Sequence, residues 1–368
     1  MTNAYAASGV DTEAGDLAVE LMKKAVSATH NPLVVGGLGG FAGMMDVSFL
    51  KQYERPLLAT STDGVGTKVA IAQAIDKHDT IGQDLVGMVV DDIVVTGARS
   101  LFMTDYIACG KVVPQRIADI VRGIAEACSA VDVALVGGET AEHPGLLHPD
   151  EYDVAGAATG VVDASKLLSA DRVQVGDVVL GLEASGFHSN GYSLVRKIVA
   201  DRGLSYTQTV PEFGSVSLGE TLLTPTRLYT RVLNQLLESD LGSQVHAMSH
   251  ITGGGIAANL SRILPDYVTL DVDRATWRPQ DMFQVLAGWG GYNLKDLEST
   301  WNLGLGFAVV VRGSAAEAIT AQLNANGIKT WQLGIIESTA CDLDAMGYTY
   351  EAKGVRGGGV RLVGDYAN

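Results

Sequence analysis

The sequence predicts a protein of two domains in which strands and helices alternate. At 368 residues the chain is longer than one ordinary hydrophobic core requires. Apolar runs typical of buried strands repeatedly end in short glycine-containing turns, and helical patterns follow them. The final third predicts a compact α/β layer, with strands near 268–272, 305–312 and 331–336 and helices near 256–264, 281–288 and 314–325. We expect the boundary between the domains within residues 166–174.

Composition narrows the class of function. The chain is 47% apolar and contains every type of side chain, as globular proteins do. Its net charge of −16 argues against a nucleic-acid surface, which requires a basic patch, and acidic clusters suit magnesium and a phosphorylated substrate instead. We expect no signal peptide and no membrane span. The cysteines have no paired spacing, and Cys109 and Cys128 lie in apolar runs, so we expect a reducing, cytoplasmic compartment.

Residues 62–68 are the main candidate for phosphate chemistry. They follow the apolar run 56–61, a predicted strand, and precede a predicted helix at 69–75. Gly64 and Gly66 allow backbone N–H groups of this turn to approach an anion, with Thr67 and Lys68 beside them, while Asp63 can hold a metal ion. The spacing of a Walker A loop is missing, and the stretch taken alone also fits an ordinary glycine turn.

Two further features precede this stretch. Asp11 is a predicted N-cap for a helix ending near residue 29, in which Lys23 by its pattern alone is a solvated surface lysine. Five glycines then occur within residues 36–43, namely Gly36, Gly37, Gly39, Gly40 and Gly43. Such a segment is either a mobile lid over an anionic ligand or a disordered linker.

Three aspartates share one face of the apolar helix predicted from residue 84 to about 97. Asp91 and Asp92 lie seven and eight residues after Asp84, so all three point to one side. Burial of three carboxylates is unfavourable unless a cation or hydrogen bonds compensate. Asp91 and Asp92 are the better metal candidates, and Asp84 either binds metal or complements the helix dipole.

The second half repeats the pattern of strand, polar loop and helix. A predicted strand at 176–182 leads into the polar loop 185–190. In this loop His188 is a proton shuttle, a phosphate ligand or a histidine that hydrogen-bonds to backbone. Residues 252–255 place three glycines before another helix near 256. The tail 353–368 is glycine-rich, and we expect it to be poorly ordered.

Together these motifs resemble the AIR synthetase (phosphoribosylformylglycinamidine cyclo-ligase) family of purine biosynthesis. The resemblance extends from residue 8 to about residue 337 and rests on segments 36–41, 62–68, 77–82, 137–144, 185–196 and 250–255. It implies an α+β fold: an N-terminal domain (1–170) that binds ATP and magnesium and pairs in a homodimer, a C-terminal α/β sandwich domain (171–345), and a tail (346–368). It also implies ATP-dependent ring closure of formylglycinamidine ribonucleotide to 5-aminoimidazole ribonucleotide, through an iminophosphate, with release of ADP and phosphate.

The resemblance also assigns roles to residues. Asp63 and Asp92 would be magnesium ligands with Asp91 as a helper. Lys23 and His188 would be catalytic groups: Lys23 would approach the ATP phosphates, and His188 would orient or protonate the substrate amide. The implied ATP-phosphate contacts are Gly36, Gly37, Gly39, Gly40, Gly64, Gly66, Thr67 and Lys68. The implied substrate contacts are Ser189, Asn190, Thr252, Gly253 and Gly254.

Some positions depart from the family pattern. His30-Asn31 replaces two basic residues, Asp91 replaces a common Asn, Phe187 a common Pro, and Leu303 the Cys of an Asn-Cys-Gly motif. Two other readings are a selenophosphate-forming enzyme, which usually has a reactive Cys in the first glycine loop, and a catalytically silent nucleotide-binding scaffold. Neither agrees well with a chain that has no Cys before Cys109 and that retains Asp63 and Lys68.

Overall fold

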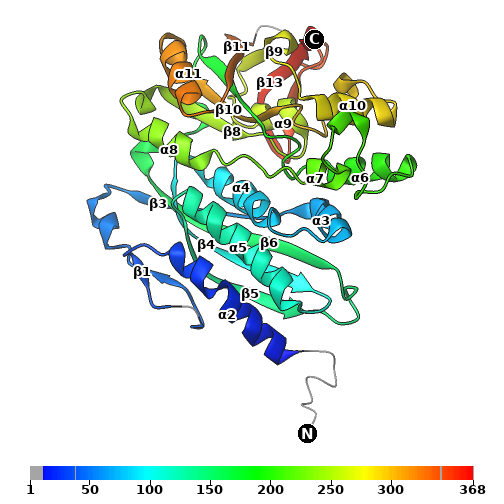
Figure 1. Ribbon diagram of the computed structural model, residues 1–368. Helices are drawn as coiled ribbons and strands as arrows, with labels where there is room; N and C mark the ends of the chain where they lie inside the picture. Colours follow the sequence, from blue (N-terminus) through cyan, green and yellow to red (C-terminus); the bar gives the residue numbers. More distant parts are fainter. Residues whose placement is uncertain (1–10, 38, 340–341, 368) are drawn as a thin grey trace. The chain divides into compact units, whose positions relative to one another are not determined.

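A computed structural model describes residues 11–37, 39–339 and 342–367 (Figure 1). By contacts, the chain divides into two compact units. The first contains residues 1–93, 98–165 and 205–231, and the second contains residues 94–97, 166–204 and 232–368. A single cut in the chain therefore does not separate the units, because residues 205–231 return to the first.

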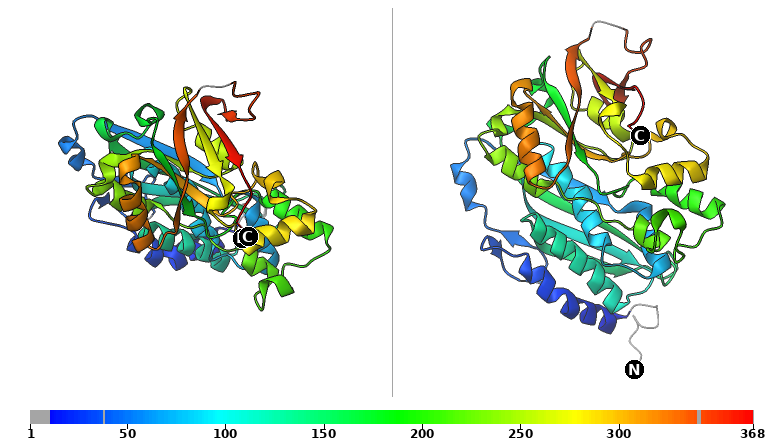
Figure 2. Two further views of the ribbon diagram at one scale, coloured as in Figure 1. Left: turned by 90° about the horizontal axis from the view of Figure 1, so that it is seen from above. Right: turned by 45° about the horizontal axis from the view of Figure 1, so that its top comes forward.

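The first unit is a four-stranded sheet with helices on one face. Its sheet has the order β3-β6-β4-β5, in which β6 is antiparallel to β3 and β4 while β4 and β5 run parallel. The elements are α2 (Thr12–Ala28), β1 (Val34–Val35), β2 (Met44–Met45), β3 (Pro56–Gly64), α3 (Val69–Ile75), α4 (Ile81–Val94), β4 (Arg99–Cys109), α5 (Pro114–Ala130), β5 (Ala134–Glu142), β6 (Tyr152–Asp163) and α7 (Leu218–Leu222). Helices α2, α4 and α5 cover the same face of this sheet (Figures 1 and 2).

The second unit is built on a seven-stranded mixed sheet of order β12-β13-β9-β11-β7-β10-β8. Its elements are β7 (Val178–Glu183), α6 (Tyr192–Asp201), α8 (Thr230–Glu238), β8 (Val245–His250), α9 (Gly255–Ser261), β9 (Val268–Asp273), α10 (Asp281–Gly290), β10 (Leu305–Val311), α11 (Ala316–Ala325), β11 (Thr330–Ser338), β12 (Thr349–Ala352) and β13 (Val355–Val363). Val179, Leu270, Val310 and Leu333 meet in its core. The predicted mixed α/β architecture, including the strands and helices of the final third, is confirmed.

The expectation of a poorly ordered tail was wrong. Residues 355–363 form β13, which pairs in parallel with β9, and Val360 is fully buried. The glycines here serve close packing: a Cβ on Gly357 would lie 1.9 Å from the carbonyl oxygen of Ser261. Composition alone suggested mobility, whereas the missing side chains allow β13 to pack against the end of α9.

The structure also confirms the expected N-cap of α2 and the expected burial of two cysteines. Asp11 caps α2 by accepting a hydrogen bond from the N–H of Ala14 at 3.0 Å. Cys109 and Cys128 are both buried, and burial raises the pKa of the Cys109 thiol to about 11. Among the helices described, none has both the length and the apolar character that crossing a bilayer requires.

Candidate active site

Asp63 lies on the sheet itself and not in a turn after it. Strand β3 continues to Gly64, whose register partner on β6 is Ala155, so the strand is three residues longer than expected. The Asp63 carboxylate accepts a hydrogen bond from the N–H of Gly64 at 2.7 Å. A short 3₁₀ turn, Gly66–Lys68, then leads into α3, with Gly66 and Thr67 exposed. Strand pairing therefore fixes the position of Asp63.

A second carboxylate shares this face of the sheet. Gly156 on β6 is the register partner of both Asp63 on β3 and Asp105 on β4, and Asp105 is in turn paired with Gly138 on β5. Register partners project to the same face, so the carboxylates of Asp63 and Asp105 lie on one face with strand β6 between them. Two strand spacings put roughly 10 Å between their Cα atoms. This is the face that α4 covers, because a Cβ on Gly156 would meet Leu85 of α4.

Sequence reasoning missed Asp105. Its one signal was an acidic residue inside the otherwise apolar run 101–109. Gly138 makes room for it, since a Cβ there would lie 1.9 Å from Oδ1 of Asp105. Burial of the carboxyl raises the pKa of Asp105 to about 7, so this group changes its protonation near neutral pH.

The raised pKa of Asp105 predicts a pH-dependent stability. From about pH 4 to about pH 7 the native carboxyl keeps a proton that the unfolded chain has lost, so the free energy of unfolding should fall as pH rises through this window. Asp105→Asn should remove this slope. Urea unfolding of both proteins at pH 5, 6, 7 and 8 in magnesium-free buffer measures it, and parallel pH profiles would contradict the assignment.

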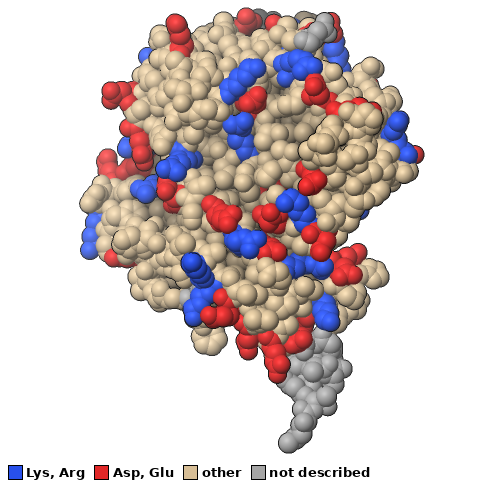
Figure 3. Space-filling model, in the orientation of Figure 1, with Lys and Arg blue, Asp and Glu red and all other residues tan. Residues whose placement is uncertain are grey.

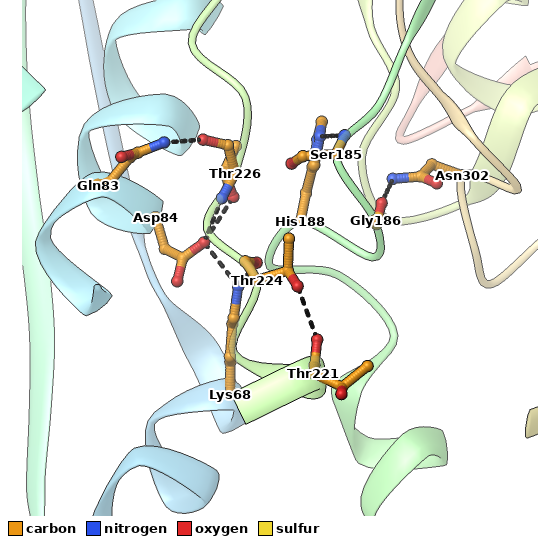
Figure 4. A network of polar contacts seen from close by, with 10 residues as sticks. All are labelled: Lys68, Gln83, Asp84, Ser185, Gly186, His188, Thr221, Thr224, Thr226 and Asn302. Carbon is orange, nitrogen blue, oxygen red and sulfur yellow. Dashed lines mark hydrogen bonds and ion pairs between the residues drawn. The ribbon is translucent and has the colours of Figure 1, made fainter. Parts of the chain in front are cut away.

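Lys68 and Asp84 form a fully buried ion pair in the first unit (Figure 4). Lys68 Nζ lies 2.8 Å from Asp84 Oδ1 and 2.7 Å from the carbonyl oxygen of Thr224. Asp84 Oδ1 also accepts from the N–H and the hydroxyl of Thr226. Burial lowers the pKa of Lys68 and raises the pKa of Asp84, while their mutual attraction opposes both shifts. This geometry places Lys68 inside the protein and supports an anchoring function instead of the expected contact with phosphate.

The other α4 acids differ from each other in environment. Asp91 is fully buried, and its carboxylate accepts hydrogen bonds from the N–H groups of Tyr229 and Thr230 and from the Thr230 hydroxyl at 2.7 Å. These bonds attach residues 229–230 to α4, which does not support the expected role of Asp91 beside a metal. Asp92 is only half-buried.

No cluster of three or more His, Cys, Asp or Glu side chains suited to a metal ion occurs within the described residues. Magnesium does not require one, because it commonly binds through one or two carboxylates together with water and substrate phosphates. The partly exposed carboxylates of Asp63 and Asp92 have the oxygen chemistry that this ion prefers.

The glycine-rich segment connects the two strands of a small hairpin. Val34–Val35 pairs antiparallel with Met44–Met45, and residues 36–43 form the loop between them, of which residue 38 lies outside the described part of the chain. Gly36, Gly37, Gly39 and Gly40 are exposed. Lys23 is also exposed on α2, where its Nζ lies 3.8 Å from Glu20.

In the second unit the His188 loop has a defined hydrogen-bond pattern (Figure 4). His188 Nε2 accepts a hydrogen bond from the N–H of Ser185 at 3.1 Å, so Nδ1 carries the proton of the neutral ring. Asn302 donates to the carbonyl oxygen of Gly186 at 2.9 Å, which fixes the start of the same loop. His188 itself is buried and has a positive φ of 58°.

The structure brings the two predicted substrate loops of this unit together. The N–H of Gly253 donates to the side-chain oxygen of Asn190 at 3.0 Å. Asn259 holds the glycine loop from within, because its Nδ2 donates to the carbonyl oxygens of Thr252 and Gly255 at 3.0 and 2.8 Å. Ser189 lies between His188 and Asn190 and is half-buried.

Two family models match successive parts of this chain. The family model described as AIR synthase related protein, N-terminal domain, matches residues 45–162, and the corresponding C-terminal domain model matches residues 174–341. The phosphoribosylformylglycinamidine cyclo-ligase of Desulfitobacterium hafniense is 46% identical over 334 residues, which cover 91% of this chain and 96% of that protein. The enzyme of the same name from Synechocystis is 45% identical over 332 residues, with 90% and 96% covered.

Solved structures share the fold at low sequence identity. Thiamine-monophosphate kinase from Stenotrophomonas maltophilia has a TM-score of 0.63 at 17% identity and covers 95% of this chain and 97% of its own. The hydrogenase maturation protein HypE in complex with ATP has a TM-score of 0.58 at 19% identity, with 89% and 87% covered.

Proposed function

Because the chain belongs to the AIR synthase related family, we propose that it is a phosphoribosylformylglycinamidine cyclo-ligase. The observation that carries this proposal is the identity of 45–46% to curated cyclo-ligases across both family domains. The reaction uses ATP to convert formylglycinamidine ribonucleotide into 5-aminoimidazole ribonucleotide, ADP and phosphate, in purine biosynthesis.

The chemistry requires activation of a poor leaving group. The formamide oxygen of the substrate attacks the γ-phosphorus of ATP and ADP leaves, which yields an iminophosphate. The amidine nitrogen then attacks the activated carbon, the imidazole ring closes, and phosphate leaves with the former formamide oxygen. Such phosphoryl transfer depends on positioning and on neutralisation of charge more than on a covalent nucleophile.

Residues of the first unit would serve ATP. Asp63 and Asp92 would hold magnesium, which when bound neutralises phosphate charge, and Asp105 adds a carboxyl to the face that carries Asp63. Lys23 would contact the phosphates, together with the half-buried backbone of Gly64 and the exposed backbone of Gly36, Gly37, Gly39, Gly40, Gly66 and Thr67. Lys68 instead holds the backbone of Thr224 while it pairs with Asp84 of α4, and Asp91 of α4 holds Tyr229 and Thr230.

Residues of the second unit would serve the ribonucleotide. The Nδ1–H of His188 can donate a hydrogen bond to the formamide oxygen and orient it for attack. Ser189 and Asn190 would contact the same substrate. Thr252, Gly253 and Gly254 would bind its phosphate, and the bond between Gly253 and Asn190 holds the two loops together.

The enzyme would act as a cytoplasmic homodimer. In the first unit the helices lie on one face of the sheet (Figure 2). The register places Leu58 and Tyr106 on the other face, opposite Val161 and Ala155 of β6, with exposures of 69% and 42%. A second copy would bury this face. The net charge of −16, and the mixture of acidic and basic side chains on the face drawn in Figure 3, do not favour nucleic acid as a partner.

Leu58→Glu should convert the dimer into a monomer, because association would bury opposing carboxylates on an apolar face. Analytical ultracentrifugation at micromolar concentration measures the mass. Leu17→Glu is the matched control, since Leu17 is similarly exposed (52%) but lies on α2, away from the open face of the sheet. A monomeric wild-type protein, or a dimeric Leu58→Glu protein, would contradict the proposed interface.

A coupled assay tests the reaction itself. The protein is mixed with ATP, magnesium and formylglycinamidine ribonucleotide, and both ADP and the aminoimidazole product are measured. ADP release that depends on the ribonucleotide, with product in equal amount, is the expected result. Absence of both in a folded protein would overturn the proposal, and phosphate transfer to selenide instead would indicate the sister activity.

A further inference from the structure

Residues 342–367 lie beyond the family model, which ends at residue 341, yet they are an integral part of the second unit. Strand β13 pairs with β9, and its first glycines pack against the end of α9, where a Cβ on Gly357 would meet the carbonyl oxygen of Ser261. The segment therefore contacts α9 at its C-terminal end.

Two carboxylates of the unit bind this segment through the same combination of groups. Asp271 accepts two hydrogen bonds from Arg361, at 2.9 and 2.8 Å, and one from the hydroxyl of Tyr348 at 2.9 Å. Glu298 accepts two from Arg274, at 2.6 and 2.8 Å, and one from the hydroxyl of Tyr366 at 2.8 Å. Tyr366 also stands edge-on to the buried Trp277, so its ring is fixed as well as its hydroxyl.

Glu298 connects the segment to the other end of α9. Gly255 is the first residue of that helix, and a Cβ on it would lie 1.6 Å from the backbone oxygen of Glu298, so the two backbones are in direct contact. The N–H of Gly255 donates to the carbonyl oxygen of Thr252 at 3.1 Å, which closes the glycine loop. The side chain of Glu298 holds Tyr366 while its backbone abuts this loop.

A cavity of about 570 Å³ lies beside this contact, lined among others by Gly254, Arg274, Glu298, Met346 and Arg361. This cavity separates Gly254 of the glycine loop from Met346 and Arg361 of the C-terminal segment. The backbone of Glu298 therefore joins the C-terminal segment to the loop at the N-terminal end of α9, in addition to the packing of β12 and β13 on that helix.

We propose that Tyr366 and Glu298 are positioning residues that hold loop 252–255 in the conformation that receives the phosphate of the ribonucleotide. The role of the loop in this statement rests on the proposed function. Loss of the Tyr366 hydroxyl leaves Glu298 with Arg274 alone and lets residues 296–299 shift against Gly255.

Kinetics of Tyr366→Phe provide the first test. The KM for formylglycinamidine ribonucleotide should rise roughly tenfold, as expected for loss of one hydrogen bond to a charged group, while kcat and the KM for ATP stay near the wild-type values. Tyr350→Phe is the matched control, because the Tyr350 hydroxyl donates to the exposed Asp344 in the same segment. Equal effects of the two variants, or a loss of thermal stability without a change in KM, would overturn the proposal.

Hydrogen exchange provides a second test that does not depend on activity. Amides of peptide 250–258 should exchange faster in Tyr366→Phe than in wild type, whereas those of β10 should not change. Unchanged exchange at 250–258 would overturn the positioning role even in an active enzyme. If the loop loosens but the wild-type protein forms no aminoimidazole product, the coupling holds and the proposed function fails.

Discussion

Asp63→Asn should lower kcat about 100-fold or more, because it removes a charge that the proposed site uses to hold magnesium against the ATP phosphates. The carboxylate is fixed on β3, and an amide fits the same space and can still accept from the N–H of Gly64. Steady-state assays at saturating ATP and magnesium measure the loss.

Asp153→Asn is the control for this experiment. Asp153 has the same local bond, to the N–H of the next residue at 2.9 Å, but it is exposed on β6. Its turnover should match the wild type. Full activity of Asp63→Asn would remove Asp63 from the site, and equal losses in both variants would point to a general effect on the sheet.

Lys68→Met should lower the free energy of unfolding by about 3–5 kcal/mol, because it leaves the Asp84 charge buried without its cation. Urea denaturation monitored by far-UV circular dichroism measures the change, because all four tryptophans lie in the second unit and do not report on the first. The double variant Lys68→Met/Asp84→Leu should recover much of the loss, since it removes the uncompensated charge as well.

Lys77→Met supplies the comparison, because Lys77 forms an exposed ion pair with Asp79 whose loss should change the free energy of unfolding by less than about 1 kcal/mol. If Lys68→Met were as stable as this control and instead raised the KM for ATP, the expectation from sequence that Lys68 contacts phosphate would be restored.

Local patterns in the sequence predicted the mixed α/β fold, because the strands and helices of this chain are marked by apolar runs and by turns between them. The succession of strand, glycine turn and helix around residues 56–75 is an example. The same local patterns wrongly ended the strand at residue 61 and placed Asp63 in a turn. The strand continues to Gly64 because it pairs there with β6, a segment about 90 residues later in the chain.

Local sequence patterns predicted the residues of the candidate site less well than they predicted the fold. The pattern of Asp84 and Asp91 correctly indicated that buried acids of α4 need compensation, but their partners Lys68, Thr226 and Thr230 come largely from residues about 140 positions away. Asp105 was missed because its significance arises only from the register that aligns it with Asp63. Glycine content suggested a mobile tail, whereas Gly357 is required for close packing.

The return of residues 205–231 to the first unit has a consequence for synthesis of the chain on the ribosome. Asp84 and Asp91 leave the exit tunnel long before Thr226 and Thr230, and until then α4 carries two carboxylates without these donors. The first unit thus cannot complete its native packing when residue 165 has emerged, and must wait until residue 231 has also left the tunnel. A nascent chain arrested between these points would remain a substrate for chaperones.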